Sequence, residues 1–219
     1  MNVMPARIHI LESPSPDDFL RGVQEGRALY ETLRIGGIDV RVHTTITRRT
    51  FETCITQITQ EVSTGDHVPI LHISGHGNAD CVEFSNGETL DWKSLGDILA
   101  PLNKALGGYL LVCMSTCFGS SALKMARRLN AQTYNTLIGP KGAVAWHDAL
   151  IAYTSFYHNF ICKRIDIPAA VKAMAIAAGI GNDIFEIASG EDAHKEFMNE
   201  VMAHLGIRSP KMPNASSRV

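Results

Sequence analysis

One histidine and one cysteine of this chain each follow an apolar run and stand close to glycine. His76 comes after the apolar run 68–74 and lies between two glycines, and Cys117 comes after the apolar run 109–114 and two residues before Gly119. Short apolar runs that end in glycine are typical of buried strands. The carboxyl ends of parallel strands share one edge of an open α/β sheet, and ligands bind there. We therefore expect the His76 and Cys117 side chains to lie close together at that edge.

A cysteine and a histidine at such an edge are suited to nucleophilic catalysis. The reactive form of cysteine is the thiolate, and Ser120 or Ser121 predicts a helix N-terminus just after Cys117, whose positive end would favour that form. A nearby histidine can accept the thiol proton and later protonate a leaving amine. The backbone N–H groups of Gly77 and Cys117 are candidates for an oxyanion hole.

The elements that would position these residues alternate between strand and helix. One helix is expected to begin at Ser15-Pro16 and to bury Phe19, Val23, Tyr30 and Leu33 on one face. Further helices are expected at about 47–63, 93–106, 121–129, 147–163, 168–178 and 191–205, and strands at 7–12, 38–46, 68–74, 109–114 and within 136–146. This order predicts an α/β fold with a mostly parallel central sheet flanked by helices.

The chain is expected to form one domain over 1–208, followed by a frayed tail at 209–219. A small hairpin at 81–92, turning at Asn86-Gly87 in a type I′ turn, would be an insertion after the strand that carries His76.

Composition limits the partners that we expect. The net charge is −2 and the chain has no polybasic segment, so nucleic acid is not an expected partner. The longest apolar run is far shorter than the ~20 residues of a membrane span, so no membrane partner is expected either. The five cysteines form no CxxC pair, which indicates a reducing compartment, and the N-terminus lacks the pattern of a signal peptide. We therefore expect a cytoplasmic protein.

Two segments resemble the signature blocks of the clan CD cysteine peptidases, which include caspases, metacaspases, separases and CHAT-domain proteases. The segments are LHISGHG and LLVCMSTCFGS, and NGETLDWKSLGDIL and IGPKGAVAWHDALIAYTSFYHNFI resemble later blocks of the CHAT or bacterial caspase-like group. The resemblance covers about 68–178 and implies a caspase-like (caspase–haemoglobinase) fold. It also implies a catalytic dyad, with Cys117 as nucleophile, His76 as general base and acid, and the Gly77 and Cys117 amides as oxyanion donors.

The resemblance further implies an endopeptidase that acts on a protein or peptide substrate without a cofactor or metal. Such enzymes are usually held inactive until a regulatory protein or a small-molecule signal arranges their loops, and prokaryotic relatives act in defence, including antiviral defence, or in stress responses. The residue two before the cysteine usually lines the S1 pocket, and here it is Ser115 where Arg-specific relatives often have Asp. Glu12 and Asp148 could still give that pocket an acidic floor, so we expect cleavage after Arg or Lys, with a small or neutral P1 residue as the alternative.

Two other functions stay open from the sequence. The same fold could serve as a non-catalytic ligand-sensing or scaffold module. Alternatively, His72, His76, Cys113 and Cys117 could bind zinc as a His2Cys2 set, because residues four apart along a strand point to the same side.

Overall fold

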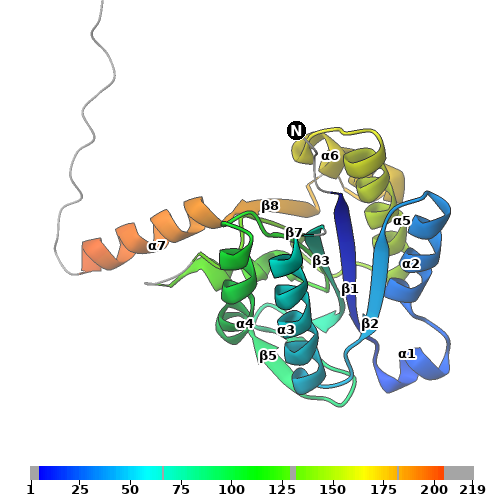
Figure 1. Ribbon diagram of the computed structural model, residues 1–219, viewed down its shortest axis with the longest axis horizontal. Coiled ribbons are helices and arrows are strands. Elements are labelled where there is room, and N and C mark those ends of the chain that lie inside the picture. Colours follow the sequence, from blue (N-terminus) through cyan, green and yellow to red (C-terminus); the bar gives the residue numbers. More distant parts are fainter. Residues whose placement is uncertain (1–4, 66, 129–131, 182, 205–219) are drawn as a thin grey trace, which may run out of the picture.

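A computed structural model describes residues 5–65, 67–128, 132–181 and 183–204. Their centre is a twisted sheet in the order β2 (Val40–Thr44), β1 (Ala6–Ser13), β3 (Val68–Gly77), β6 (Leu111–Ser115), β7 (Thr136–Pro140) and β8 (Phe185–Ser189) (Figure 1). The first five of these strands pair in parallel, and β8 pairs with β7 in the antiparallel sense. The α/β class and the mostly parallel sheet are therefore confirmed.

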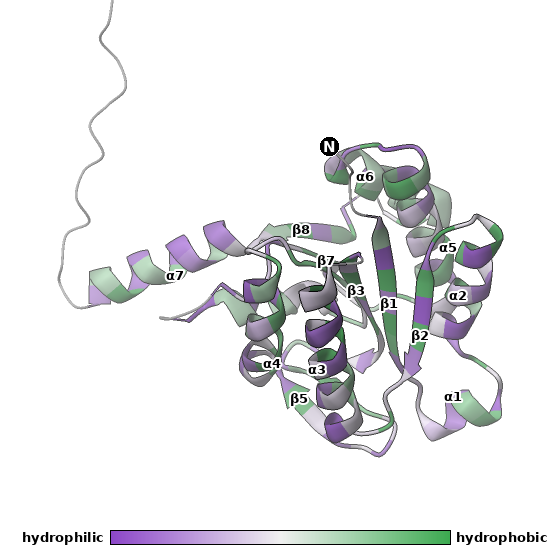
Figure 2. Cartoon of the chain, in the orientation of Figure 1, coloured by the Kyte–Doolittle hydropathy of each residue, from purple (hydrophilic) through white to green (hydrophobic). Residues whose placement is uncertain are grey.

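Helices cover both faces of the sheet (Figure 1). On one face α2 (Glu25–Ile35), α5 (Trp146–Tyr157) and α6 (Ile167–Ala178) share a core with the strands, and on the other α3 (Arg48–Thr64), α4 (Trp92–Ala105) and the 3₁₀ helix η1 (Gly119–Ala126) share a second core. Successive residues of a strand contribute to opposite cores, as Ile70 and Leu71 of β3 do. Green hydrophobic residues alternate with purple ones along β1 and β2, and α3 shows hydrophilic residues on its outer side, whereas α6 is mostly hydrophobic (Figure 2).

Local sequence signals explain where several elements begin and end. Thr47 and Thr50 form a capping box at the start of α3, and Gly65 ends that helix with a φ of 77°. Phe51, Ile55 and Ile58 of α3 are buried, as the helical spacing of the apolar residues predicts. Helix α7 (Gly190–His204) contacts η1 and β8 and extends beyond the edge of the sheet (Figure 1).

The first expected helix is two helices, so that prediction was wrong in part. A capping box of Ser15 and Asp18 opens the short α1 (Pro16–Leu20), and the chain then turns at Gly22, which has a φ of 69°. Helix α2 begins afresh at Glu25. Phe19 is 60% exposed and does not share the buried face of Leu33, because the turn at Gly22 interrupts the helical periodicity.

Other boundaries also differ from the sequence-based expectation. Cys117 precedes a 3₁₀ helix and not an α-helix, and no side chain caps its start. The hairpin of β4 (Cys81–Glu83) and β5 (Thr89–Asp91) attaches to the end of β3 as expected, but its turn is not type I′. Phe84 and Gly87 close that turn with a hydrogen bond of 2.8 Å, and only Gly87 of the turn has a positive φ, of 83°.

Two features at the C-terminal side were not expected. Helix α5 continues into a π-helical turn, η2 (His158–Cys162), where a single α-helix was predicted. Strand β8 was missed because the alternation in Phe185–Ser189 is short and lies between two helical segments. The predicted tail at 209–219 lies outside the described residues. No helix within the described ranges is long and apolar enough to cross a membrane.

Candidate active site

A cavity of about 150 Å³ opens at the carboxyl ends of β3 and β6. The two strands are paired up to Ser74 and Ser115, and beyond that pairing β3 continues to Gly77, where it pairs with β4, while β6 turns at Cys117. The structure therefore brings His76 and Cys117 to the walls of one cavity. Its lining is Gly75, His76, Ser115, Thr116, Cys117, Pro140, Val144, Ala145, Trp146, Ala149, Tyr153 and Phe185.

The His76 ring is held by a carboxylate that the sequence analysis did not assign to the site. Nε2 of His76 lies 2.5 Å from Oδ2 of Asp18, and the ring meets Trp146 edge-on with centroids 5.3 Å apart. Asp18 is the capping-box residue of α1, which follows β1 directly, and Oγ of Ser15 donates to the same Oδ2 at 2.6 Å. The sequence predicted a helix start at Ser15-Pro16, but nothing in it indicated that the Asp18 carboxylate would reach the end of β3.

The charge state of Asp18 determines which nitrogen of His76 is free. Burial acts to raise the Asp18 pKa, but hydrogen bonds from Ser15 and His76 outweigh it, so the pKa lies below its usual value. Asp18 is therefore a carboxylate at neutral pH and accepts a proton-bearing Nε2. This arrangement leaves the lone pair of neutral His76 on Nδ1, as a base requires.

Cys117 lies half-buried in a tight turn at the end of β6. Its Sγ lies 4.0 Å from the Val144 carbonyl oxygen. Phe118 takes the left-handed conformation with a φ of 57°, and its N–H donates to the Gly142 carbonyl at 2.9 Å. The helix that follows Cys117, η1, is a 3₁₀ helix and not the α-helix whose positive end was expected to favour the thiolate.

Two glycines allow the close approach of the strand ends. A Cβ at Gly77 would lie 3.2 Å from Thr116 Cβ and 3.4 Å from the Cys117 carbonyl oxygen. A Cβ at Gly119 would lie 2.7 Å from Met114 Cβ. Close contact between the ends of β3 and β6 thus depends on the absence of a side chain at Gly77, and the tight turn after β6 depends on its absence at Gly119. The Gly77 and Cys117 amides remain the predicted oxyanion donors.

The three residues expected to form the S1 pocket are not brought together. Ser115 lines the cavity, and its buried Oγ has no hydrogen-bond partner among the described residues. Glu12 lies outside it: the carboxylate is buried and accepts hydrogen bonds from the Gly26 and Arg27 amides at 2.7 and 3.3 Å, so it caps α2. Asp148 also lies outside the lining, with Oδ1 3.3 Å from Nε2 of the neighbouring His147.

The cavity wall is mostly apolar instead of acidic. Tyr153, Ala149 and Phe185 form part of it, and the Tyr153 hydroxyl donates to the Met114 carbonyl at 2.8 Å. Burial raises the Tyr153 pKa well above its usual value, so this side chain is neutral. The described residues that line the cavity include no Asp, Glu, Lys or Arg. The arrangement suits an uncharged substrate side chain.

The four residues of the His2Cys2 alternative do not converge. His72 is fully buried and contacts the Tyr157 hydroxyl at 3.1 Å and the Glu25 carboxylate at 3.4 Å. Cys113 is buried in the helix-covered core, and burial raises the pKa of its thiol to about 12. Since His76 is engaged by Asp18, the described part of the chain holds no ligand group made of these four side chains.

No protein-family model matches this chain, and a comparison with curated proteins finds no match.

Proposed function

We propose that the protein is a cysteine endopeptidase with Cys117 as nucleophile and His76 as general base. The observation that carries the proposal is that both side chains line one cavity while the Asp18 carboxylate holds Nε2 of His76. A thiol, an imidazole and a carboxylate are the usual components of a site in which a base activates the nucleophile and a third group orients the base.

The proposed reaction proceeds through a thioester. Nδ1 of His76 takes the Cys117 proton as Sγ attacks the scissile carbonyl carbon, and the oxyanion is stabilised by the Gly77 and Cys117 amides. The imidazolium, stabilised by Asp18, then protonates the leaving amine and the carbon–nitrogen bond breaks. Water, deprotonated by His76, attacks the thioester and releases the acid product with the free thiol.

The cavity favours an apolar or small neutral P1 residue. A buried Arg or Lys side chain without a partner is costly, and neither Glu12 nor Asp148 reaches the lining to pair with it. We therefore no longer expect the preference for Arg or Lys that the acidic residues suggested.

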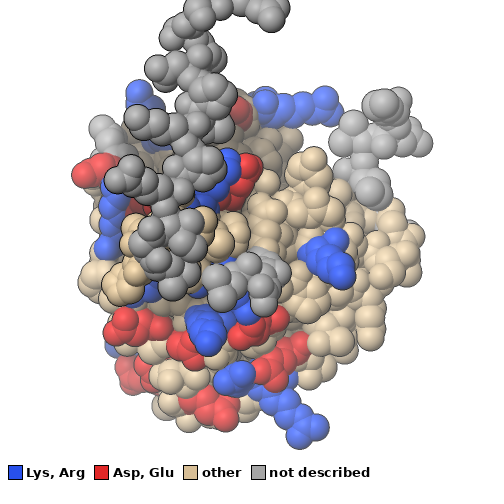
Figure 3. Space-filling model, turned by 90° about the vertical axis from the view of Figure 1, so that its left-hand side faces the viewer, with Lys and Arg blue, Asp and Glu red and all other residues tan. Residues whose placement is uncertain are grey.

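The proposed substrate is a protein or peptide. On the described part of the face shown in Figure 3, acidic and basic side chains are interspersed, which does not suit a polyanion such as nucleic acid. A cytoplasmic location and control by a regulatory protein or small-molecule signal belong to the same proposal, on the strength of the sequence resemblance. The free state of all five cysteines is compatible with a reducing compartment.

The experiment that tests the function is labelling with acyl electrophile probes that differ in the P1 side chain. We expect one label per chain on Cys117, fastest with an apolar P1 residue, and no label in Cys117→Ala. The matched control is Cys162→Ala, which removes an exposed thiol outside the cavity and should label normally. Equal labelling of Cys162 and Cys117 would favour the non-catalytic module, and peptide cleavage that survives Cys117→Ala would show that Cys117 is not the nucleophile.

A further inference from the structure

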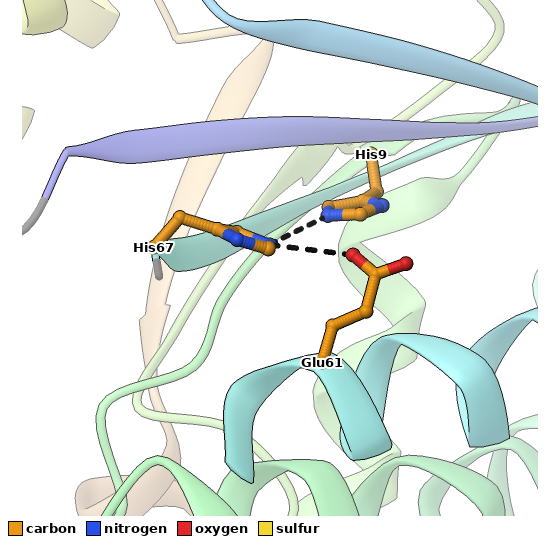
Figure 4. A group of neighbouring side chains, drawn as sticks. All are labelled: His9, Glu61 and His67. Atoms are coloured by element: carbon orange, nitrogen blue, oxygen red, sulfur yellow. Dashed lines mark hydrogen bonds and ion pairs between the residues drawn. The ribbon is translucent and has the colours of Figure 1, made fainter. Parts of the chain in front are cut away.

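We propose that His9, His67 and Glu61 form a binding site for one divalent transition-metal ion of the zinc class. The site lies away from the cavity of Cys117, and the proposal does not depend on the proposed function. Among the described residues, these three are the one group whose potential ligand atoms all lie within 4.8 Å of one another. Figure 4 shows the two imidazoles and the carboxylate converging from β1, the segment before β3 and α3.

The distances between the ligand atoms fit coordination. Nε2 of His9 lies 3.2 Å from Nε2 of His67, and Oε2 of Glu61 lies 3.8 Å from the latter. Two nitrogens bound at ~2.05 Å to a tetrahedral ion are about 3.3 Å apart. The two Nε2 atoms therefore stand close to the separation that an ion between them would require.

The surroundings keep both histidines neutral, as ligands must be. Burial, together with His43, His67 and the two nearby arginines, lowers the His9 pKa to about 3. Burial and Arg7 likewise lower the His67 pKa, against the opposing effect of Glu61. The positive charges of Arg7 and Arg41 are matched by Asp39, 2.8 Å from Arg7, and by Glu61, 3.1 Å from Arg41. The cation would thus enter surroundings whose fixed charges cancel.

Hydrogen bonds show what must change when the ion binds. Nη1 of Arg7 lies 3.2 Å from Nδ1 of His67, so without metal the His67 proton is on Nε2 and points at Nε2 of His9. His9 then carries its own proton on Nδ1, which faces Nε2 of His43 at 3.1 Å. His9 therefore already presents a lone pair, and His43 orients it as an outer hydrogen-bond partner.

Only His67 has to change tautomer. Its proton moves from Nε2 to Nδ1, Arg7 leaves that nitrogen while keeping Asp39, and the ion takes the position of the proton between the two imidazoles. No proton is released in this exchange. The three ligands and a water molecule would complete a four-coordinate site, since Glu61 is 36% exposed and leaves one side open to solvent.

The test uses Zn²⁺ alone with the full chain carrying Cys117→Ala, which removes the thiol that could bind zinc in the cavity. Titration calorimetry should show one ion per chain, and Co²⁺ should give a tetrahedral spectrum without a thiolate charge-transfer band. At a zinc concentration of about 100 times Kd, Tm should rise by roughly 5–10 °C.

The variants are chosen so that loss of folding and loss of ligands can be distinguished. Glu61→Gln removes a half-exposed carboxylate of α3 and should weaken zinc binding by about 10–100-fold, as should His67→Gln. The controls Glu52→Gln, on the same helix, and His147→Gln, at the protein surface, should bind zinc as the parent does. Circular dichroism and Tm in chelator establish that each variant is folded.

The proposal is overturned if the parent binds no zinc with a Kd below about 1 mM. It is also overturned if folded Glu61→Gln and His67→Gln bind as tightly as the parent, or if the two controls lose binding equally.

Discussion

At the scale of single residues, the orientation of His76 depends on the Asp18 carboxylate. The carboxylate fixes the tautomer of the ring and, in the proposed mechanism, would stabilise the imidazolium formed when the thiol is deprotonated. Asp18 acts through His76 and is a positioning residue, not a catalytic one.

Asp18→Asn should therefore lower kcat/KM by about 10²–10⁴-fold, because the neutral amide cannot stabilise the imidazolium. The control is Asp17→Asn, on the same short helix, where the exposed carboxylate pairs with Arg21. Peptide cleavage over a pH series measures both variants. A loss of less than threefold in Asp18→Asn, or an equal loss in Asp17→Asn, would remove Asp18 from the mechanism.

Asp18 should also contribute to stability in a pH-dependent way. Its pKa is lowered in the folded protein, so its contribution is fully present above the usual aspartate pKa of about 3.9 and is lost as the pH falls through the lower folded value. Urea unfolding of the protein and of Asp18→Asn between pH 3 and pH 7 should give curves that differ most at neutral pH. Parallel curves over the whole range would show that the Asp18 carboxyl has the same pKa in the folded and the unfolded protein.

His9 should make the free energy of unfolding fall in acid. Its folded pKa of about 3 lies far below the usual value of about 6.5. The unfolded chain therefore binds a proton that the folded chain rejects, and stability is lost as the pH falls from 6.5 towards 3. For this one group the slope reaches about 1.4 kcal/mol per pH unit.

Unfolding experiments in chelator test that slope. In His9→Gln it should be smaller than in the parent protein, and in His158→Gln, whose position lies in η2, it should be unchanged. An unaltered slope in His9→Gln would mean that His9 is not held neutral by its surroundings.

At the scale of elements, the turn between β6 and η1 places the nucleophile. Gly119→Ala should destabilise the protein by about 1–3 kcal/mol and slow the labelling of Cys117, because the new Cβ would lie 2.7 Å from Met114 Cβ. Gly142→Ala is the matched control: its carbonyl accepts the Phe118 N–H, but a Cβ there meets nothing within 4 Å. Similar labelling rates in the two variants would show that the turn can accommodate a Cβ at position 119 without displacing Cys117.

The elements also show how far sequence reasoning reaches. The strand ends near His76 and Cys117 were predicted because uninterrupted apolar runs followed by glycine leave strong local signals. Asp18 was not predicted as a site residue, because its contact with His76 joins segments 58 residues apart along the chain. Glu12 was misplaced for a related reason: the sequence places it at a strand end but does not reveal that α2 begins against it.

The proposed metal-binding group of His9, Glu61 and His67 was also not predicted, because only the tertiary structure brings these residues together. His9, Glu61 and His67 come from a strand, a helix and the segment before another strand, so no spacing in the sequence relates them. Strand β8 was missed, and the 3₁₀ conformation of the predicted helix η1 was not recognised, for another reason. Their periodic signal covers few residues, and pairing with a neighbour decides their conformation.

At the scale of the whole molecule, charge is small and dispersed. With a net charge of −2 and interspersed charges on the face in Figure 3, the protein should bind DNA or RNA no more tightly than about 10⁻⁴ M at physiological salt. Fluorescence anisotropy with labelled oligonucleotides measures this. Micromolar binding that weakens steeply with salt would point to a basic surface on another side and to a different substrate class.

Phe185, which lines the cavity, belongs to β8 and lies far along the chain from the nucleophile. During synthesis, His76 and Cys117 therefore emerge from the ribosome well before Phe185, which completes the cavity wall, has been added to the chain. The nascent chain then carries the proposed nucleophile and base without the full cavity wall, and β8 can complete that wall only by pairing with β7 late in synthesis. On the proposed function, the order of the strands along the chain therefore delays substrate recognition until the sheet is complete.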